Sequence, residues 1–257
     1  MLPKKSLGQN FLTSIPARIA IVEAGHLTSN DTVLEIGPGR GFLTEGLLKT
    51  GAHIIALEKD TDLLPLLTET FSSYKNFSLI EGDALTYTPP STPYKIIANI
   101  PYYITGAILR YYLSHIHHPI QMVVLIQKEV AERIVARDKK ESILSLSVKA
   151  YGDPRIVYRV NKGSFNPAPK VDSAVLSVEN ISRSNFKNQY HEDIFFKVLH
   201  AGFAHKRKYL LSNLREVFPL ISFELLFTEL SISEKARAED VTLPSWIQLS
   251  LSIATHS

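Results

Sequence analysis

The sequence contains no cysteine among its 257 residues. Disulfide bonds, zinc sites built on thiolates and cysteine nucleophiles are therefore all excluded. Long apolar runs are missing too, since none reaches the roughly 18 residues that indicate a membrane-spanning helix. The lysines near the N-terminus are not followed by the apolar core of a secretory signal. We therefore expect a cytoplasmic protein with no membrane partner.

What the chain does contain is ordinary for a globular protein. Hydrophobic residues make up 45% and charged residues 21% of the sequence, which excludes wholesale disorder. The length suffices for one α/β domain plus a small appended module. The formal net charge of +3 is compatible with a polyanionic partner without requiring one. The nine histidines show no metal-ligand spacing, so no metal is expected.

Short apolar segments alternate with helical patterns over the first two thirds of the chain. The segments that predict strands are 32–37, 53–58, 77–83, 94–100, 122–127 and 174–178. Helical patterns fit between several of them, at 42–50, 61–73 and 105–114. Most of the strand segments are apolar throughout, as in strands covered on both faces. The alternation predicts an α/β fold with a parallel sheet and helices on both sides.

The character of the sequence changes after about residue 180. A polar stretch at 179–193 resembles a linker, and short amphipathic helices are predicted at 194–203, 208–217, 224–230 and 244–253. We therefore expect two domains, a catalytic domain over 1–185 and a small all-helical domain over 186–257. Nothing indicates more than a monomer.

Acidic residues and glycines gather where the first three predicted strands end. Glu35 precedes a turn in which Gly37, Gly39 and Gly41 alternate with other residues, and Glu58 and Asp83 end the next two strands. A glycine turn lets the backbone approach a ligand, and a carboxylate at the second strand can accept bonds from ribose hydroxyls. A purely structural turn would explain the glycines but not the acids. Because the pattern departs from the dinucleotide fingerprint, it favours S-adenosylmethionine (SAM) as the cofactor.

The most specific motif is Asn99-Ile100-Pro101-Tyr102, at the end of the fourth predicted strand. An adenine amino group is a poor nucleophile because its lone pair is delocalised into the ring. The Asn99 side-chain oxygen and the Ile100 carbonyl can each accept one N–H bond and direct the lone pair at a methyl donor. Pro101 stiffens the turn, and Tyr102 can stack on the base. Phe165 is a second candidate for clamping the base, or else an anchor for its loop.

Several longer strings resemble one family, the RsmA/KsgA small-subunit ribosomal RNA adenine dimethyltransferases. They are KKSLGQNFL at 4–12, EIGPGRG at 35–41, LEKD at 57–60, EGDAL at 81–85, NIPY at 99–102, FNPAPKVDSAV at 165–175 and FAHKRKYLLSNL at 203–214. The resemblance covers nearly the whole chain. One departure within these strings is Arg40, where an aliphatic residue is usual.

The resemblance implies a class I methyltransferase fold with a mostly parallel, seven-stranded, Rossmann-like sheet and a helical C-terminal domain. It implies dimethylation of two adjacent adenines in the 3′-terminal hairpin loop of the small-subunit (16S) RNA, within an assembling 30S subunit. The expected cofactor-binding residues are Gln9, Asn10, Leu12, Glu35, Gly37, Gly39, Glu58, Lys59, Asp83, Ala84 and Asn99.

Groups of basic residues are candidates for contacting RNA phosphates. They are Lys4, Lys5, Arg133, Lys206, Arg207 and Lys208. Three other readings stay open: the related enzymes that methylate large-subunit RNA, a DNA adenine methyltransferase, and a catalytically silent assembly factor. Chain length and the FAHKRK string favour the small-subunit enzyme, and no target-recognition insertion for DNA is evident. The intact motif at Asn99 argues against a silent factor.

Overall fold

The computed structural model describes residues 3–4 and 7–256, which fall into two compact units. One unit comprises Met1–Glu132 and Gly152–Ile181 and is called the sheet unit below. The other comprises Arg133–Tyr151 and Ser182–Ser257 and is called the helical unit. Each is described by itself.

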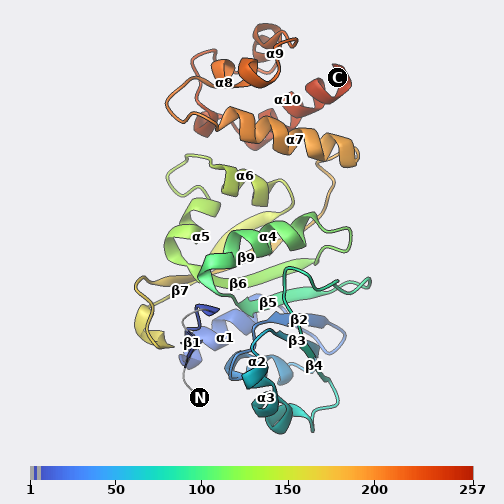
Figure 1. Cartoon of the computed structure of the whole chain (residues 1–257), viewed down its shortest axis with the longest axis vertical. Helices are drawn as coiled ribbons and strands as arrows, with labels where there is room; N and C mark the ends of the chain where they lie inside the picture. Colours follow the sequence, from blue (N-terminus) through green and yellow to red (C-terminus); the bar gives the residue numbers. More distant parts are fainter. Residues whose placement is uncertain (1–2, 5–6, 257) are drawn as a thin grey trace. The chain divides into compact units, whose positions relative to one another are not determined.

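A seven-stranded sheet forms the centre of the sheet unit, with the strand order β4-β3-β2-β5-β6-β9-β7 (Figure 1). Its members are β2 (Thr32–Ile36), β3 (His53–Glu58), β4 (Phe77–Glu81), β5 (Lys95–Asn99), β6 (Gln121–Gln127), β7 (Asp153–Val160) and β9 (Ser173–Glu179). The strands from β4 to β6 are parallel neighbours, whereas β9 runs antiparallel to both β6 and β7. The mostly parallel sheet of the sequence analysis is confirmed.

Helices cover this sheet because its central strands have no face turned to water. All but the last residue of β6 are buried, as are the last four residues of β2. The helices here are α1 (Ile15–Ala24), α2 (Phe42–Leu48), α3 (Leu64–Phe71), α4 (Thr105–Ser114) and α5 (Lys128–Ile134), with short 3-10 turns η2 (Thr61–Leu63), η3 (Tyr102–Ile104) and η4 (Lys162–Ser164). Helix α1 packs on α2 and on β6, β7 and β9.

The order of strands creates a switch point between β2 and β5. The chain runs from β2 outward to β3 and β4, then returns to the other side of β2 to form β5. Ligands of open α/β sheets bind at the carboxyl ends of the strands at such a point. A separate two-stranded ribbon, β1 (Phe11–Leu12) with β8 (Phe165–Asn166), ties the start of the chain to the loop before β9.

The helical unit has its own apolar core. It contains α6 (Ile143–Lys149), α7 (Gln189–Gly202), α8 (Leu210–Val217), α9 (Phe223–Glu229), η5 (Ala238–Asp240) and α10 (Leu243–His256), and α7 packs against α6, α8 and α10 (Figure 1). Phe195, Phe223, Phe227 and Trp246 are fully buried in it. Among the helices described, none is long and apolar enough to cross a membrane.

The division between the units differs from the expected one in two stretches, residues 133–151 and residues 182–185. The sequence analysis put residues 133–151 in the first domain, whereas in the structure they group with the helical unit. The Tyr151 hydroxyl donates to Glu192 at the start of α7, and the Asn185 side chain donates to the Ala150 carbonyl at 2.8 Å. These polar contacts have no hydropathy signature, so the pattern of apolar residues did not reveal them.

Candidate functional site

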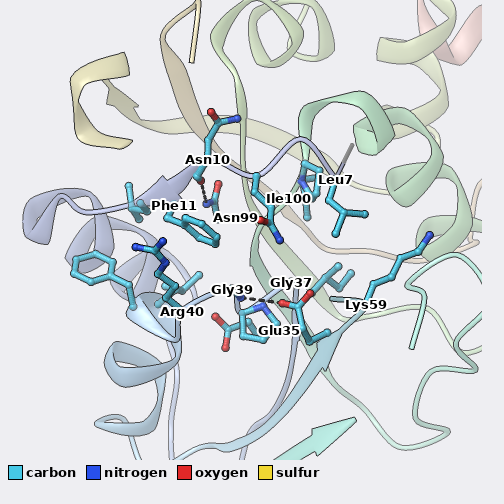
Figure 2. A pocket seen from close by; sticks show the side chains of 18 of the residues that line it. Leu7, Asn10, Phe11, Glu35, Gly37, Gly39, Arg40, Lys59, Asn99 and Ile100 are labelled. Atoms are coloured by element: carbon cyan, nitrogen blue, oxygen red, sulfur yellow. Dashed lines mark hydrogen bonds between the residues drawn. The ribbon is translucent and has the colours of Figure 1, made fainter. Parts of the chain in front are cut away.

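A cavity of about 480 Å³ opens at the switch point, within the size range of small-molecule sites (Figure 2). It is bounded by the turn after β2, by the ends of β3 and β5, by the turn after β4, and by the N-terminal segment, defined here as residues 7–13. All the residues expected to bind the cofactor line it: Gln9, Asn10, Leu12, Glu35, Gly37, Gly39, Glu58, Lys59, Asp83, Ala84 and Asn99. Ile100, Pro101 and Tyr102 line it as well.

The turn after β2 depends on glycine for two reasons. Gly37 and Gly39 both have positive φ angles, 66° and 59°, which side-chain-bearing residues rarely adopt. A Cβ on Gly37 would meet no atom within 4 Å, so the bare backbone borders open space. A Cβ on Gly39 would lie 3.0 Å from the Phe11 ring, which packs over the turn. The glycines thus admit both a ligand and the N-terminal segment.

Two buried glutamates form the floor of the cavity. Glu58 accepts hydrogen bonds from the Gly39 N–H at 3.0 Å and from the Asp60 N–H at 2.8 Å, one on each carboxylate oxygen. Burial raises the pKa of Glu58, while these backbone bonds oppose the rise. A carboxylate has about four lone-pair sites, so Glu58 keeps acceptor capacity for a ligand donor.

Glu35 is the more deeply buried of the two acids, with 1% of its surface exposed. Its Oε2 accepts the Thr44 hydroxyl at 2.7 Å, and its Oε1 has no hydrogen-bond partner among the described residues. Burial raises the pKa of Glu35 to about 8, and the charge of Glu58 adds to the rise. This oxygen is a buried polar atom that a bound molecule would supply with a hydrogen-bond partner.

At the rim of the cavity, Lys59 pairs with Asp83. The Lys59 ammonium lies 2.8 Å from Asp83 Oδ2, and the Leu85 N–H donates to Asp83 Oδ1 at 2.9 Å. The lysine holds the pKa of Asp83 below its ordinary value. Asp83 is therefore an ionised acceptor at neutral pH.

The side-chain amide of Asn99 has a defined orientation. Its Nδ2 donates to the backbone carbonyl of Asn10 at 3.1 Å (Figure 2). A carbonyl accepts hydrogen bonds and never donates them, so the amide nitrogen must face Asn10 and the Oδ1 must face away from it. Asn99 thus offers an acceptor oxygen whose direction is set by the N-terminal segment.

The aromatic candidates lie in different surroundings. The Tyr102 hydroxyl shares a 2.6 Å hydrogen bond with Ser173, and burial raises the pKa of Tyr102. Phe165 is 4% exposed, belongs to the apolar core and is not among the residues that line the cavity. It therefore lies where a loop anchor would, and clamping a base would require its side chain to turn outward.

Phe11, Arg40 and Tyr103 are among the lining residues that were not singled out as site residues from sequence. Phe11 packs on the glycine turn, and the Arg40 guanidinium lies 4.5 Å from the centre of its ring (Figure 2). Tyr103 is 62% exposed and lies against Gly8 of the N-terminal segment. Phe11 lies inside the KKSLGQNFL string and Tyr103 directly follows NIPY, so adjacency to these motifs was the available signal.

The basic residues expected to bind RNA do not share one environment. Lys206, Arg207 and Lys208 are exposed in the helical unit, where Lys208 pairs with Glu216 at 2.7 Å. Arg133 is exposed at the end of α5, and Lys4 pairs with Asp60 and Asp62 in the sheet unit. Lys5 lies outside the described residues. Within the part of the chain that is described, no group of three His, Asp or Glu residues is placed to hold a metal ion.

Two solved structures, of a dimethyladenosine transferase and of a 23S rRNA methyltransferase, share this architecture along almost its whole length. A dimethyladenosine transferase from Plasmodium falciparum is 26% identical, with a TM-score of 0.82 over 95% of this chain and 98% of its own. The 23S rRNA methyltransferase ErmE is 25% identical, with a TM-score of 0.79 over 96% of this chain and 100% of its own. The fold and the site define a class I methyltransferase that depends on SAM.

The sequence comparisons narrow this class. Residues 2–255 match the family model described as ribosomal RNA adenine dimethylase. A ribosomal RNA small subunit methyltransferase A from Dehalococcoides mccartyi is 41% identical over 98% of this chain and 88% of its own. A protein of the same name from Fusobacterium nucleatum is 37% identical over 96% of both chains. The chain belongs to the ribosomal RNA adenine dimethylase family.

The residues present fit SAM. The open space at Gly37 admits a ligand close to the backbone, and the unpartnered oxygen of Glu35 is a buried polar atom that a ligand would satisfy. The ionised Asp83 and the spare lone pairs of Glu58 are acceptors of the kind that an adenine amino group and ribose hydroxyls require.

Proposed function

We propose that this protein transfers methyl groups from SAM to the N6 atoms of two adjacent adenines in the 3′-terminal hairpin loop of 16S RNA. The substrate in this proposal is an assembling 30S subunit in the cytoplasm, and the enzyme acts as a monomer. Membership of the dimethylase family and relatives named as small-subunit enzymes support the choice of RNA. The observation that carries the chemistry is the Asn99 amide, which Asn10 holds so that its oxygen faces away from the Asn10 carbonyl.

In the cofactor half of the site, the residues act by binding and orientation. Glu58 would accept hydrogen bonds from the ribose hydroxyls of SAM, and Asp83 would accept one from its adenine amino group. Glu35 supports the turn after β2 from beneath, through Thr44 in α2. The glycine turn keeps the backbone close to the ligand. SAM supplies a methyl group that its sulfonium makes electrophilic, so positioning is the main task left to the protein.

In the other half, the Asn99 oxygen and the Ile100 carbonyl accept the two N–H bonds of the target amino group. The nitrogen then directs its lone pair at the methyl carbon. SAM held by Glu58 and Asp83 would supply the methyl group and leave as a neutral thioether, and the amino nitrogen held by Asn99 and Ile100 would release one proton to water. No general base of high pKa is needed, because the nitrogen becomes strongly acidic once it is methylated and cationic.

Tyr102 is proposed to stack on the extruded adenine, with its hydroxyl fixed by Ser173. Phe165 anchors the loop after β7 in this structure, and a direct role for it requires a rotated side chain. Lys206, Arg207 and Arg133 are exposed and suited to phosphates, whereas Lys4 and Lys208 have carboxylate partners that RNA would have to displace.

The choice of RNA is tested with labelled SAM and two substrates offered side by side, unmethylated small subunits and large subunits. The proposal predicts label in the small-subunit RNA alone. Label in the large-subunit RNA would contradict it and favour the activity named for the ErmE structure. No label in either, with SAM bound, would favour a silent assembly factor.

A further inference from the structure

The N-terminal segment lines the cavity, and the position of its Asn10 carbonyl sets the orientation of the Asn99 amide. Its Asn10 carbonyl receives the Asn99 amide, and Phe11 and Leu12 pair with β8 just beyond. The β1–β8 pairing holds only the far end of this segment. Residues 7–10 need another attachment, because they belong to no extended sheet.

Asp60, just after β3, supplies that attachment. Its side chain is 2% exposed, and its Oδ2 accepts the Gln9 side-chain amide at 2.7 Å. Its Oδ1 receives the Lys4 ammonium and the Asp62 N–H. Its backbone N–H meanwhile donates to Glu58 Oε1 at 2.8 Å. A single residue therefore contacts both the N-terminal segment and the glutamate at the floor of the cavity.

Both ends of the Gln9 side-chain amide are engaged within the protein. Its Oε1 accepts a hydrogen bond from the backbone N–H of Lys4 at 2.8 Å, while its Nε2 donates to the Asp60 carboxylate. Gln9 lines the cavity, yet these bonds make its amide a link between the segment and Asp60. The residue next to this link is Asn10, whose carbonyl fixes the Asn99 amide.

We propose that Asp60 is a positioning residue that sets Asn99 through Gln9 and Asn10, and Glu58 through its own backbone N–H. This inference rests on the proposed function, because it concerns how two hydrogen-bond acceptors, Asn99 for the target amino group and Glu58 for the cofactor, are held in position. The charge state fits the role. Burial acts to raise the pKa of Asp60, but hydrogen bonds from Lys4 and Gln9 outweigh it, so the pKa is lowered and the carboxylate stays ionised.

Three variants test the link. Asp60→Asn places an amide donor or a weakened acceptor opposite Gln9 and removes the charge facing Lys4. Gln9→Glu sets two carboxylates against each other across a 2.7 Å contact. In the double variant, the new amide at position 60 can donate to the new carboxylate at position 9, which still accepts the Lys4 N–H. The hydrogen bond is restored with its direction reversed.

Two readouts are combined. Hydrogen exchange at the amides of residues 7–13, measured without cofactor, should quicken in each single variant and return to the wild-type rate in the double variant. The kcat on small subunits should fall roughly 10- to 100-fold in the single variants, as expected for a misplaced reacting group, and recover in the double variant. The fold decrease in kcat should be larger than the fold decrease in SAM affinity, because the variants leave the glycine turn and Asp83 unchanged.

Asp62→Asn is the matched control. Asp62 also pairs with Lys4, but its side chain is 55% exposed. Exchange and kcat should stay close to wild type in this variant. Unchanged exchange in Asp60→Asn, or no recovery in the double variant, would overturn the proposed role of Asp60. Wild-type protein that leaves small subunits unmethylated would instead overturn the proposed function, while exchange would still report on the link.

Discussion

The residues expected to act in the sheet unit and those expected to act in the helical unit are arranged in opposite ways. Around the cavity, Glu58, Asp83 and Asn99 each have a defined partner that fixes a carboxylate or an amide. In the helical unit, Lys206 and Arg207 are exposed. Methyl transfer requires sub-ångström placement, whereas attraction to a polyanion requires charge at the surface. Substitutions in the two units should therefore fail in different ways.

The largest effect is expected for Asn99. Asn99→Ala removes an acceptor for the amino group, and kcat should fall roughly 100- to 1,000-fold, as for the loss of one preorganised polar group in an active site. Asn99→Asp should fail as well, because a carboxylate oxygen would face the Asn10 carbonyl. Single-turnover methylation of small subunits measures this effect. Near-normal turnover by either variant would remove Asn99 from the mechanism.

Glu58→Ala should mainly weaken cofactor binding. Loss of charge-assisted bonds to two ribose hydroxyls should lower the affinity for SAM roughly 100-fold, measured by calorimetry. Affinity for the small subunit should be unchanged, since Glu58 is buried and 6% exposed. Glu69→Gln, at an exposed glutamate on α3, serves as the control. Full SAM affinity in Glu58→Ala would contradict the assignment of the cofactor site.

Glu35 should make stability depend on pH. Its pKa is about 8 in the folded protein, against 4.5 as its ordinary value. Between these values the folded state holds a proton that the unfolded state has lost, so raising the pH favours unfolding. The stability that Glu35 contributes is fully present below pH 4.5 and is lost progressively up to about pH 8. Chemical denaturation should show that the free energy of unfolding of the wild-type protein falls by a few kcal/mol over this pH range. In Glu35→Gln this fall should be absent. An equal slope in both proteins would contradict a protonated Glu35.

The smallest effect belongs to the helical unit. Lys206→Ala and Arg207→Ala should each weaken binding to small subunits about tenfold or less. Each should also reduce the slope of log affinity against log salt concentration by roughly one. Lys208→Ala should do less, because Lys208 already pairs with Glu216. Lys235→Ala removes an exposed charge from the same unit as a control. Filter binding at several salt concentrations gives the slopes, and equal slopes for Lys206→Ala and Lys235→Ala would rule out a phosphate contact at Lys206.

The units also differed in how well sequence predicted them. Strands β2, β3 and β5 begin and end within one residue of the expected positions, since strands buried on both faces are apolar throughout. Strand β7 was not predicted, because it is a half-exposed edge strand whose pairing with β9 decides its structure. Helix α7 begins at Gln189, inside the expected linker. Its first turn buries His191 and Glu192 through specific hydrogen bonds, which polarity alone does not reveal.

Within the site, residue types were predictable and their connections were not. Carboxylates at the ends of neighbouring strands indicate the edge of the sheet where a ligand binds, so Glu58 and Asp83 could be found from spacing alone. The contact from Asn10 to Asn99 joins residues 89 positions apart, and no local pattern encodes it. The burial of Phe165 likewise depends on β1 and β8 meeting.

The most direct test of the proposed function is to sequence the methylated product by mass spectrometry. Unmethylated small subunits are incubated with the enzyme and SAM, and nuclease fragments of the RNA are analysed for modified adenines. We predict two neighbouring N6,N6-dimethyladenosines in the fragment that contains the 3′-terminal hairpin loop. A product without dimethyladenosine, or one modified elsewhere in the RNA, would contradict the function assigned to this protein.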